Sequence, residues 1–172
     1  MITMPKAEVT LTSDSAVKVT RQFNAPRNLV YKAYTTPDLV KRWLLGPPGW
    51  SMPVCEMDLR VGGKYRWRWR SDEGGKEFGF HGEFREVQAP SRIVHTEFFD
   101  PGDMGGDMGN GALITLEFTE SKGVTTMAIL MDYYTKEARD AALSTGMTDG
   151  MEYSYQLLDK VLAETSPQKA SA

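Results

Sequence analysis

The stretch Tyr65-Arg66-Trp67-Arg68-Trp69-Arg70 decides the fold class of this chain. Aromatic and cationic residues alternate in it, and successive side chains of a β-strand point to opposite faces of the sheet. The pattern therefore predicts a strand with one aromatic face and one cationic face. The cationic face is interpreted either as a basic recognition surface or as the solvent-facing side of a sheet, balanced by Glu83 and other acids on neighbouring strands.

Further segments with a period of two lie on both sides of this stretch, and most are separated by short turns rich in glycine, proline or aspartate. The predicted strands occupy residues 54–59, 78–84, 93–99, 112–119 and 124–133. A run of strands joined mainly by hairpin turns indicates an antiparallel sheet.

Helical signals lie outside this run of strands. Residues 9–23 predict one strand or a bent pair of strands, and two short helices follow at about 26–34 and 37–44. After Thr135 the apolar spacing becomes helical, which predicts a long terminal helix with a break near Gly146. We therefore expect an α+β fold in which a curved antiparallel sheet of about six to seven strands wraps around the long C-terminal helix.

The composition is that of one ordinary globular domain. The chain has 172 residues, 41% of them hydrophobic and 25% charged, with a net charge of −3. We expect a single domain over residues 1–165 and a disordered tail over residues 166–172. With no export signal, no run of about 20 apolar residues and no basic excess, the sequence predicts a cytoplasmic protein that binds neither a membrane nor nucleic acid.

Several motifs taken together resemble one protein family. They are Phe23-Asn24-Ala25-Pro26, the helix end from Trp43 to Pro47, Asp58-Leu59-Arg60-Val61-Gly62-Gly63-Lys64-Tyr65, His81-Gly82-Glu83-Phe84, Pro90-Ser91-Arg92-Ile93-Val94 and the terminal amphipathic helix. From about Val17 to Leu162 the chain resembles the family named after the activator of the heat-shock protein 90 ATPase, within the START-like (SRPBCC) helix-grip superfamily. Family members commonly carry Gly-Trp at the start of the long helix, where this chain has Gly150-Met151.

The resemblance implies a cavity between sheet and helix more strongly than it implies a reaction. Superfamily relatives bind lipids, hormones or polyketides there, or catalyse cyclisation and hydration. Large aromatic and flexible methionine side chains suit such a cavity. The candidate cavity residues are Trp43, Trp50, Tyr65, Trp67, Trp69, His95, Met127, Met131, Met147, Met151 and Tyr155. At least two of the aromatic residues are predicted to border one cavity, and the alternative interpretation is ordinary core packing.

The sequence assigns no catalytic residue, no cofactor and no metal. The two histidines, His81 and His95, lack further ligands at zinc spacing, and a structural role is the alternative to an acid-base role for His95. Residues 101–111 carry Gly-Asp-Met-Gly twice and predict a mobile loop. Asp100, directly before the loop, and Asp103 and Asp107 within it do not match a calcium loop. Met104 and Met108 of the loop suit either a flap over a cavity or a hairpin tip.

Two further local predictions concern single residues. Asp58 and Arg60 lie on one strand face just before a glycine pair, which predicts an ion pair that fixes the strand end or anchors a polar ligand. The lone Cys55 falls on a predicted strand, which indicates a buried, inert thiol.

Three functions are consistent with these observations. The first is binding of a small apolar or amphipathic molecule between the sheet and the C-terminal helix. The second, implied by the family name, is a co-chaperone surface that contacts a heat-shock ATPase as protein partner. The third is a cavity enzyme, such as a cyclase, hydrolase or dehydratase, that uses His95 or Tyr155.

Overall fold

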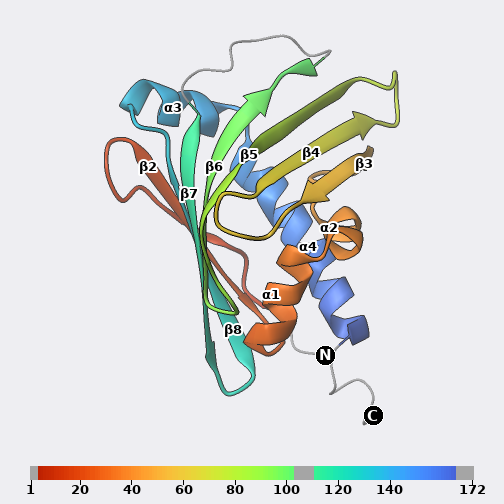
Figure 1. Cartoon of the computed structure of the whole chain (residues 1–172), viewed down its shortest axis with the longest axis vertical. Coiled ribbons are helices and arrows are strands. Elements are labelled where there is room, and N and C mark those ends of the chain that lie inside the picture. The colour runs from red at the N-terminus through yellow and green to blue at the C-terminus, as the bar shows by residue number, and fades with distance from the viewer. Residues whose placement is uncertain (1–3, 103–110, 166–172) are drawn as a thin grey trace.

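In the computed structural model, residues 4–102 and 111–165 are described, and they form eight strands and four helices (Figure 1). In chain order these are β1 (Glu8–Thr10), β2 (Ala16–Phe23), α1 (Arg27–Thr35), α2 (Pro37–Trp43), β3 (Trp50–Met57), β4 (Lys64–Ser71), β5 (Glu77–Gln88), β6 (Arg92–Asp100), β7 (Ala112–Ser121), β8 (Val124–Asp132), α3 (Lys136–Ser144) and α4 (Met147–Thr165).

The strands form one antiparallel sheet in the order β1-β2-β8-β7-β6-β5-β4-β3. The predicted α+β helix-grip fold is confirmed, with more strands than expected. One of the additional strands is β1, because the segment before Phe23 is a bent pair of strands and not a single one. The predicted limits of β3 were wrong, since the strand runs over Trp50–Met57 and Asp58 already belongs to the turn that leads into β4.

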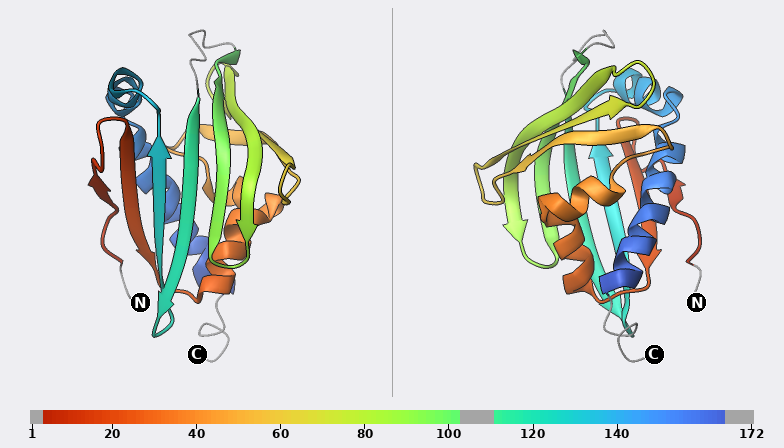
Figure 2. Two further views of the ribbon diagram at one scale, coloured as in Figure 1. Left: turned by 60° about the vertical axis from the view of Figure 1, so that its left-hand side comes forward. Right: turned by 90° about the vertical axis from the view of Figure 1, so that its right-hand side faces the viewer.

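The sheet curls around α4, and α1 and α2 lie on the same side of it (Figures 1 and 2). The apolar face of α4 meets the inner face of the sheet, and Phe23, Phe118, Met127 and Leu158 are completely shielded from solvent between them. This burial of one helix face and one sheet face is what makes the arrangement stable.

Strand β4 has the predicted two faces. Tyr65 and Trp69 are buried on the inner side, and the arginines lie on the outer side. Arg68 contacts Glu77 at 3.1 Å and Asp100 at 2.6 Å, and Arg70 also contacts Glu77. The prediction that acids of neighbouring strands balance this row is confirmed, but it was wrong for Glu83, which pairs with Arg85 on its own strand. The acids come instead from the ends of β5 and β6, where side chains from adjacent strands meet.

The break between α3 and α4 falls at Gly146, as predicted. Gly146 has a φ of +79°, a conformation that L-residues adopt only at a cost, and its amide donates to Leu143 O. Gly150, four residues on, lies inside α4, and a Cβ there would meet only Pro47 Cδ at 3.8 Å. The two glycines therefore have different roles.

Alanine substitution separates these roles. We expect Gly146→Ala to destabilise the protein by about 1–2 kcal/mol, because a Cβ strains the left-handed backbone. We expect Gly150→Ala to stabilise it by about 0.5–1 kcal/mol, because alanine loses less conformational entropy than glycine in a helix. Urea unfolding of both variants measures the two changes, and a loss of stability in Gly150→Ala would contradict the account given for α4.

Candidate functional site

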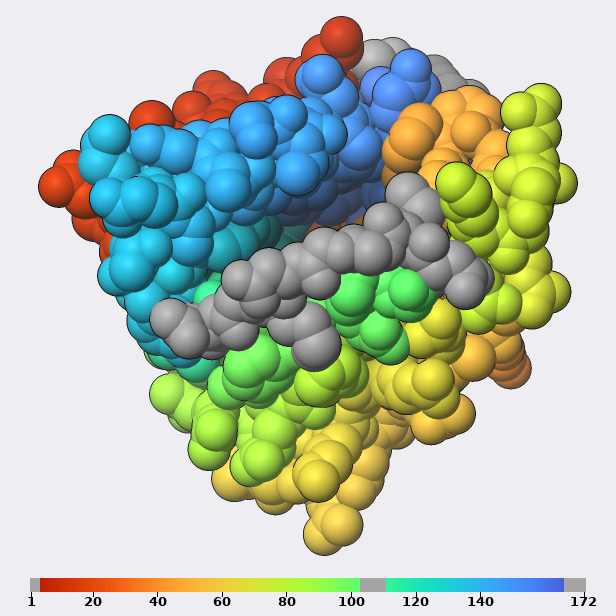
Figure 3. Space-filling view, turned by 90° about the horizontal axis from the view of Figure 1, so that it is seen from above, coloured from red at the N-terminus to blue at the C-terminus, as the bar shows by residue number. Residues whose placement is uncertain are grey.

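The molecule is hollowed at one end of the helix-grip. Seen from above, the space-filling surface sinks between α3 and α4 on one side and the sheet on the other (Figure 3). We call this depression the hollow. It lies between the helices and the sheet, and concave regions are the usual places for small-molecule sites.

Several large side chains pack on the main core and still keep part of their surface accessible. Five of the fifteen residues of this kind are called the partly exposed set below: Trp67, Ile129, Tyr133, Met147 and Met151. Tyr133 immediately follows β8, and its hydroxyl donates to Met147 Sδ at 3.4 Å, at the first residue of α4. This contact joins the end of the sheet to the start of the helix through a phenol and a flexible thioether.

The other predicted cavity residues divide into two clusters. Trp43, Tyr65, Met127, Met131 and Tyr155 belong to the buried part of the main core. The Trp43 indole donates to Ala33 O at 3.0 Å, which fixes it as a packing residue between the first two helices. The structure thus places Trp67, Met131, Met147, Met151, Tyr65, His95 and Tyr155 in or against one cluster.

Trp50 and Trp69 lie in a second, smaller cluster with Val40, Met52 and Cys55. Trp69 donates to Leu44 O at 2.6 Å, and Trp50 meets Phe78 edge-on at 5.2 Å. These two indoles therefore join α2 to the β3–β5 end of the sheet. Burial raises the pKa of the Cys55 thiol to about 11, so the thiol stays protonated and unreactive at neutral pH.

His95 is buried on the inner face of β6, with 4% of its surface exposed. Its Nδ1 lies 3.0 Å from Thr96 O, and the Tyr65 hydroxyl donates to the same carbonyl at 2.7 Å. A carbonyl oxygen only accepts, so Nδ1 carries the proton and Nε2 is the unprotonated nitrogen of the neutral ring. Burial lowers the pKa of His95 to about 4, which keeps the ring neutral at physiological pH.

Glu97 is the residue of this site that the sequence analysis missed. It lies two residues after His95 on the same strand face and pairs in register with Ala112 on β7. Burial raises the pKa of its carboxyl group to about 7, yet water still reaches part of the side chain. Among the described residues it makes no hydrogen bond or ion pair. Glu97 is therefore an acid on the inner face of the sheet that is not sealed from water.

Two phenols lie on either side of this carboxyl group. Burial, together with the charge of Glu97, raises the pKa values of Tyr65 and Tyr133 above the ordinary tyrosine value. The signal for Glu97 was present in the sequence, because Ile93, His95, Glu97 and Phe99 share one parity and the acid stands among inward-facing residues. A charged residue at such a position is the exception that calls for a functional reason.

The remaining chemical candidates lie elsewhere. His81 is on the outer face, where its ring stacks on Phe98 at 5.6 Å. The predicted pair Arg60–Asp58 is confirmed at 2.8 Å, and both side chains are exposed. No group of three His, Cys, Asp or Glu residues that could hold a metal occurs in residues 4–102 and 111–165. Of the loop acids, Asp100 pairs with Arg68, whereas Asp103, Asp107, Met104 and Met108 lie outside the described residues, as does the predicted tail.

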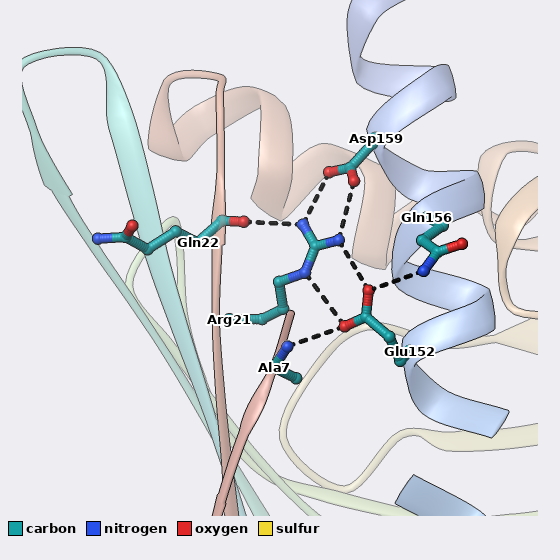
Figure 4. A network of polar contacts seen from close by, with 6 residues as sticks. All are labelled: Ala7, Arg21, Gln22, Glu152, Gln156 and Asp159. Carbon is teal, nitrogen blue, oxygen red and sulfur yellow. Dashed lines mark hydrogen bonds and ion pairs between the residues drawn. The ribbon is translucent and has the colours of Figure 1, made fainter. Parts of the chain in front are cut away.

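A buried ion network fixes α4 to the sheet (Figure 4). Arg21 on β2, with 3% of its surface exposed, donates to Asp159 at 2.9 Å and to Glu152 at 3.1 Å. Glu152 also accepts from the backbone amide of Ala7 and from Gln156. Burial would lower the pKa of Arg21, but its bonds to Asp159 and Glu152 raise it above the ordinary value. The network is saturated, so it is a structural clamp.

These features define a class of protein, a START-like helix-grip domain with a hollow beside its long helix. A family model described as Activator of Hsp90 ATPase homolog 1-like protein matches residues 24–163, and the chain belongs to this family. A search of curated proteins found no match. No helix in the described part of the chain is both long enough and apolar enough to span a membrane.

Solved structures with the same fold come from several bacteria. A protein of Rhodobacter sphaeroides is 31% identical over 92% of this chain and 99% of its own, with a TM-score of 0.84. A protein of Nitrosomonas europaea is 23% identical over 90% of this chain and 98% of its own, with a TM-score of 0.77. An AHSA1-like protein of Aeromonas hydrophila is 20% identical over 84% of this chain and 93% of its own, with a TM-score of 0.63.

Proposed function

We propose that the protein binds a small apolar or amphipathic molecule in the hollow between the sheet and α4, with the partly exposed set as its lining. The observation that carries this proposal is Glu97, a carboxyl group surrounded by protein and still reached by water. A solid core excludes such a group, because an unpaired buried acid costs several kcal/mol in an apolar interior. Apolar walls with few polar groups are the usual composition of a small-molecule site.

Thermal unfolding with a panel of small apolar and amphipathic compounds tests the proposal. A ligand present at about 100 times its dissociation constant stabilises the fold by about 2.7 kcal/mol, which for a chain of this size raises Tm by roughly 5–10 °C. A set of compounds that raises Tm in this range supports a binding function. No rise across the panel would contradict it.

Filling the hollow provides the matched test. Met151 belongs to the partly exposed set, so Met151→Trp places an indole in the proposed site. We expect this variant to fold and to lose at least tenfold in affinity for any panel ligand, because the added volume displaces it. Tyr153→Trp, two residues on at an exposed position, is the control and keeps the affinity. Isothermal titration measures both, and an unchanged affinity in Met151→Trp would place the ligand elsewhere.

The co-chaperone function rests on the family description alone, and catalysis has weaker support than binding. His95 stays neutral, but its Nδ1 is committed to Thr96 O, and the Tyr155 ring packs edge-on against Phe23 at 5.7 Å in the core. If the compound panel gives no ligand, the experiment to perform is capture of a purified heat-shock ATPase by the immobilised protein.

A further inference from the structure

We propose that the molecule held in the hollow is an organic cation with an apolar tail, and that its ammonium group pairs with Glu97 beside the rings of Trp67 and Tyr133. This inference rests on the proposed binding function and names its ligand class. Four observations on the described residues lead to it.

The first observation is that Glu97 has no cationic partner. Two other partly buried acids of the described chain are compensated, since Glu152 and Asp159 both bond Arg21. Glu97 makes no such contact within the described residues, and the arginines of β4 lie on the opposite side of the sheet. His95, the nearest titratable group on the same strand face, is neutral. An uncompensated carboxyl group in a protein interior is satisfied either by water or by a ligand that brings the charge.

The second observation is the row of residues across the sheet at the level of Glu97. Glu97 pairs in register with Ala112 on β7. Because Leu113 pairs with Asp132 on β8, the following residue, Tyr133, comes next to Ala112 on the side away from Glu97. Ala112 has only a methyl side chain and is buried in the main core, so it places no polar group between Glu97 and Tyr133. The carboxyl group and the phenol therefore face each other across a small residue.

The third observation concerns the aromatic groups on the other flank. The Tyr65 hydroxyl donates to Thr96 O, the carbonyl that directly precedes Glu97. The Tyr65 and Trp67 ring centroids are 4.6 Å apart, and Trp67 keeps part of its surface accessible. Aromatic rings attract an organic cation through their negative faces, and a neighbouring carboxylate adds a direct ion pair.

The fourth observation is what the site disfavours. An anionic ligand such as a fatty acid would bring a second carboxylate next to Glu97, and like charges in a poorly hydrated space repel strongly. Among the described residues no cation faces the inner side at this level to receive it. The negative charge of Glu97 therefore favours an amine over a carboxylic acid with an alkyl chain of the same length.

Titration calorimetry with four octyl compounds of equal chain length tests this assignment. The probes are octylamine, octyltrimethylammonium, octanol and octanoate, each kept below its micelle concentration. In the unaltered protein we expect both cations to bind at least tenfold more tightly than octanol, and octanoate to bind more weakly than octanol. In Glu97→Gln we expect this preference to vanish while octanol binds as before. Glu73→Gln, the same change on an exposed turn, keeps the preference.

The outcomes separate the ligand class from the binding function itself. Equal binding of cations and octanol, or a preference for octanoate, overturns the cation assignment and leaves the hollow as a binding site for apolar molecules. Binding of none of the four probes overturns both. A cation preference that persists in Glu97→Gln overturns the role of Glu97. Circular dichroism of each variant confirms that the fold is retained before affinities are compared.

Discussion

Replacing Arg21 by alanine is expected to destabilise the protein by about 3–5 kcal/mol, because it leaves two carboxylates near α4 without their cation. Glu152 is largely shielded from solvent and accepts hydrogen bonds from the Arg21 guanidinium and the Ala7 amide. Without Arg21, water compensates its charge poorly. The guanidinium also lies 5.0 Å from the Phe23 ring centroid, and that contact is lost as well. Chemical unfolding at neutral pH measures the change.

An exposed arginine provides the control for this prediction. Arg60 pairs with Asp58 at 2.8 Å, as short as the contacts of Arg21, but 75% and 53% of the two side chains are exposed. We expect Arg60→Ala to change stability by less than about 0.5 kcal/mol, because solvent screens such pairs. If both alanine variants lose the same stability, burial is not what makes the Arg21 network strong.

Replacing Glu97 by glutamine is expected to stabilise the protein by about 2–3 kcal/mol at pH 8 and by much less at pH 4. Burial raises the carboxyl pKa from 4.5 to about 7, so the folded state holds its proton more tightly than the unfolded state. Below pH 4.5 the Glu97 carboxyl group is protonated in both the folded and the unfolded state, so it costs no stability. As pH rises through 4.5 the unfolded state ionises first, and the penalty on folding grows until the folded carboxyl ionises near pH 7.

Unfolding curves of both proteins across this pH range measure the difference directly. The contribution of His95 has the opposite sign. Because burial lowers its pKa, the folded protein loses stability as the pH falls from 6.5 to about 4. Comparing Glu97→Gln with the unaltered protein at each pH cancels this contribution. A constant difference between pH 4 and pH 8 would mean that Glu97 does not titrate in the fold as described.

The architecture could be predicted from the sequence because local signals and fold agree. The alternation from Tyr65 to Arg70 holds in β4, and the proline before α1 and the glycine between α3 and α4 stand at the helix ends. The position of β3 could not be predicted as well. Its start at Trp50 depends on pairing with Ser71 and on a bulge between Ser51 and Val54, and such register shifts come from the neighbouring strand.

The candidate site was less predictable, because hydrophobicity alone does not distinguish a fully buried residue from one that keeps accessible surface. Trp43 and Trp67 are equally apolar, but Trp43 is sealed by a bond to Ala33 O and Trp67 keeps accessible surface. Only the three-dimensional curvature of the sheet separates them. The signal for Glu97 is an acid at an inward-facing strand position, which is stronger evidence of a site than histidines or aromatic rows.

The distance along the chain between the partners of the Arg21 clamp bears on how the protein comes to be folded. Arg21 lies 131 residues before Glu152 and 138 before Asp159, and β2 pairs with β8. During synthesis the first strands therefore leave the ribosome long before the elements that complete their pairing. Contacts between such distant parts of the chain slow folding. Until they form, one edge of the sheet is unpaired and Arg21 lacks its acidic partners. Because charged side chains oppose edge-to-edge association of strands, we expect Arg21 to help keep this edge from aggregating before α4 is made.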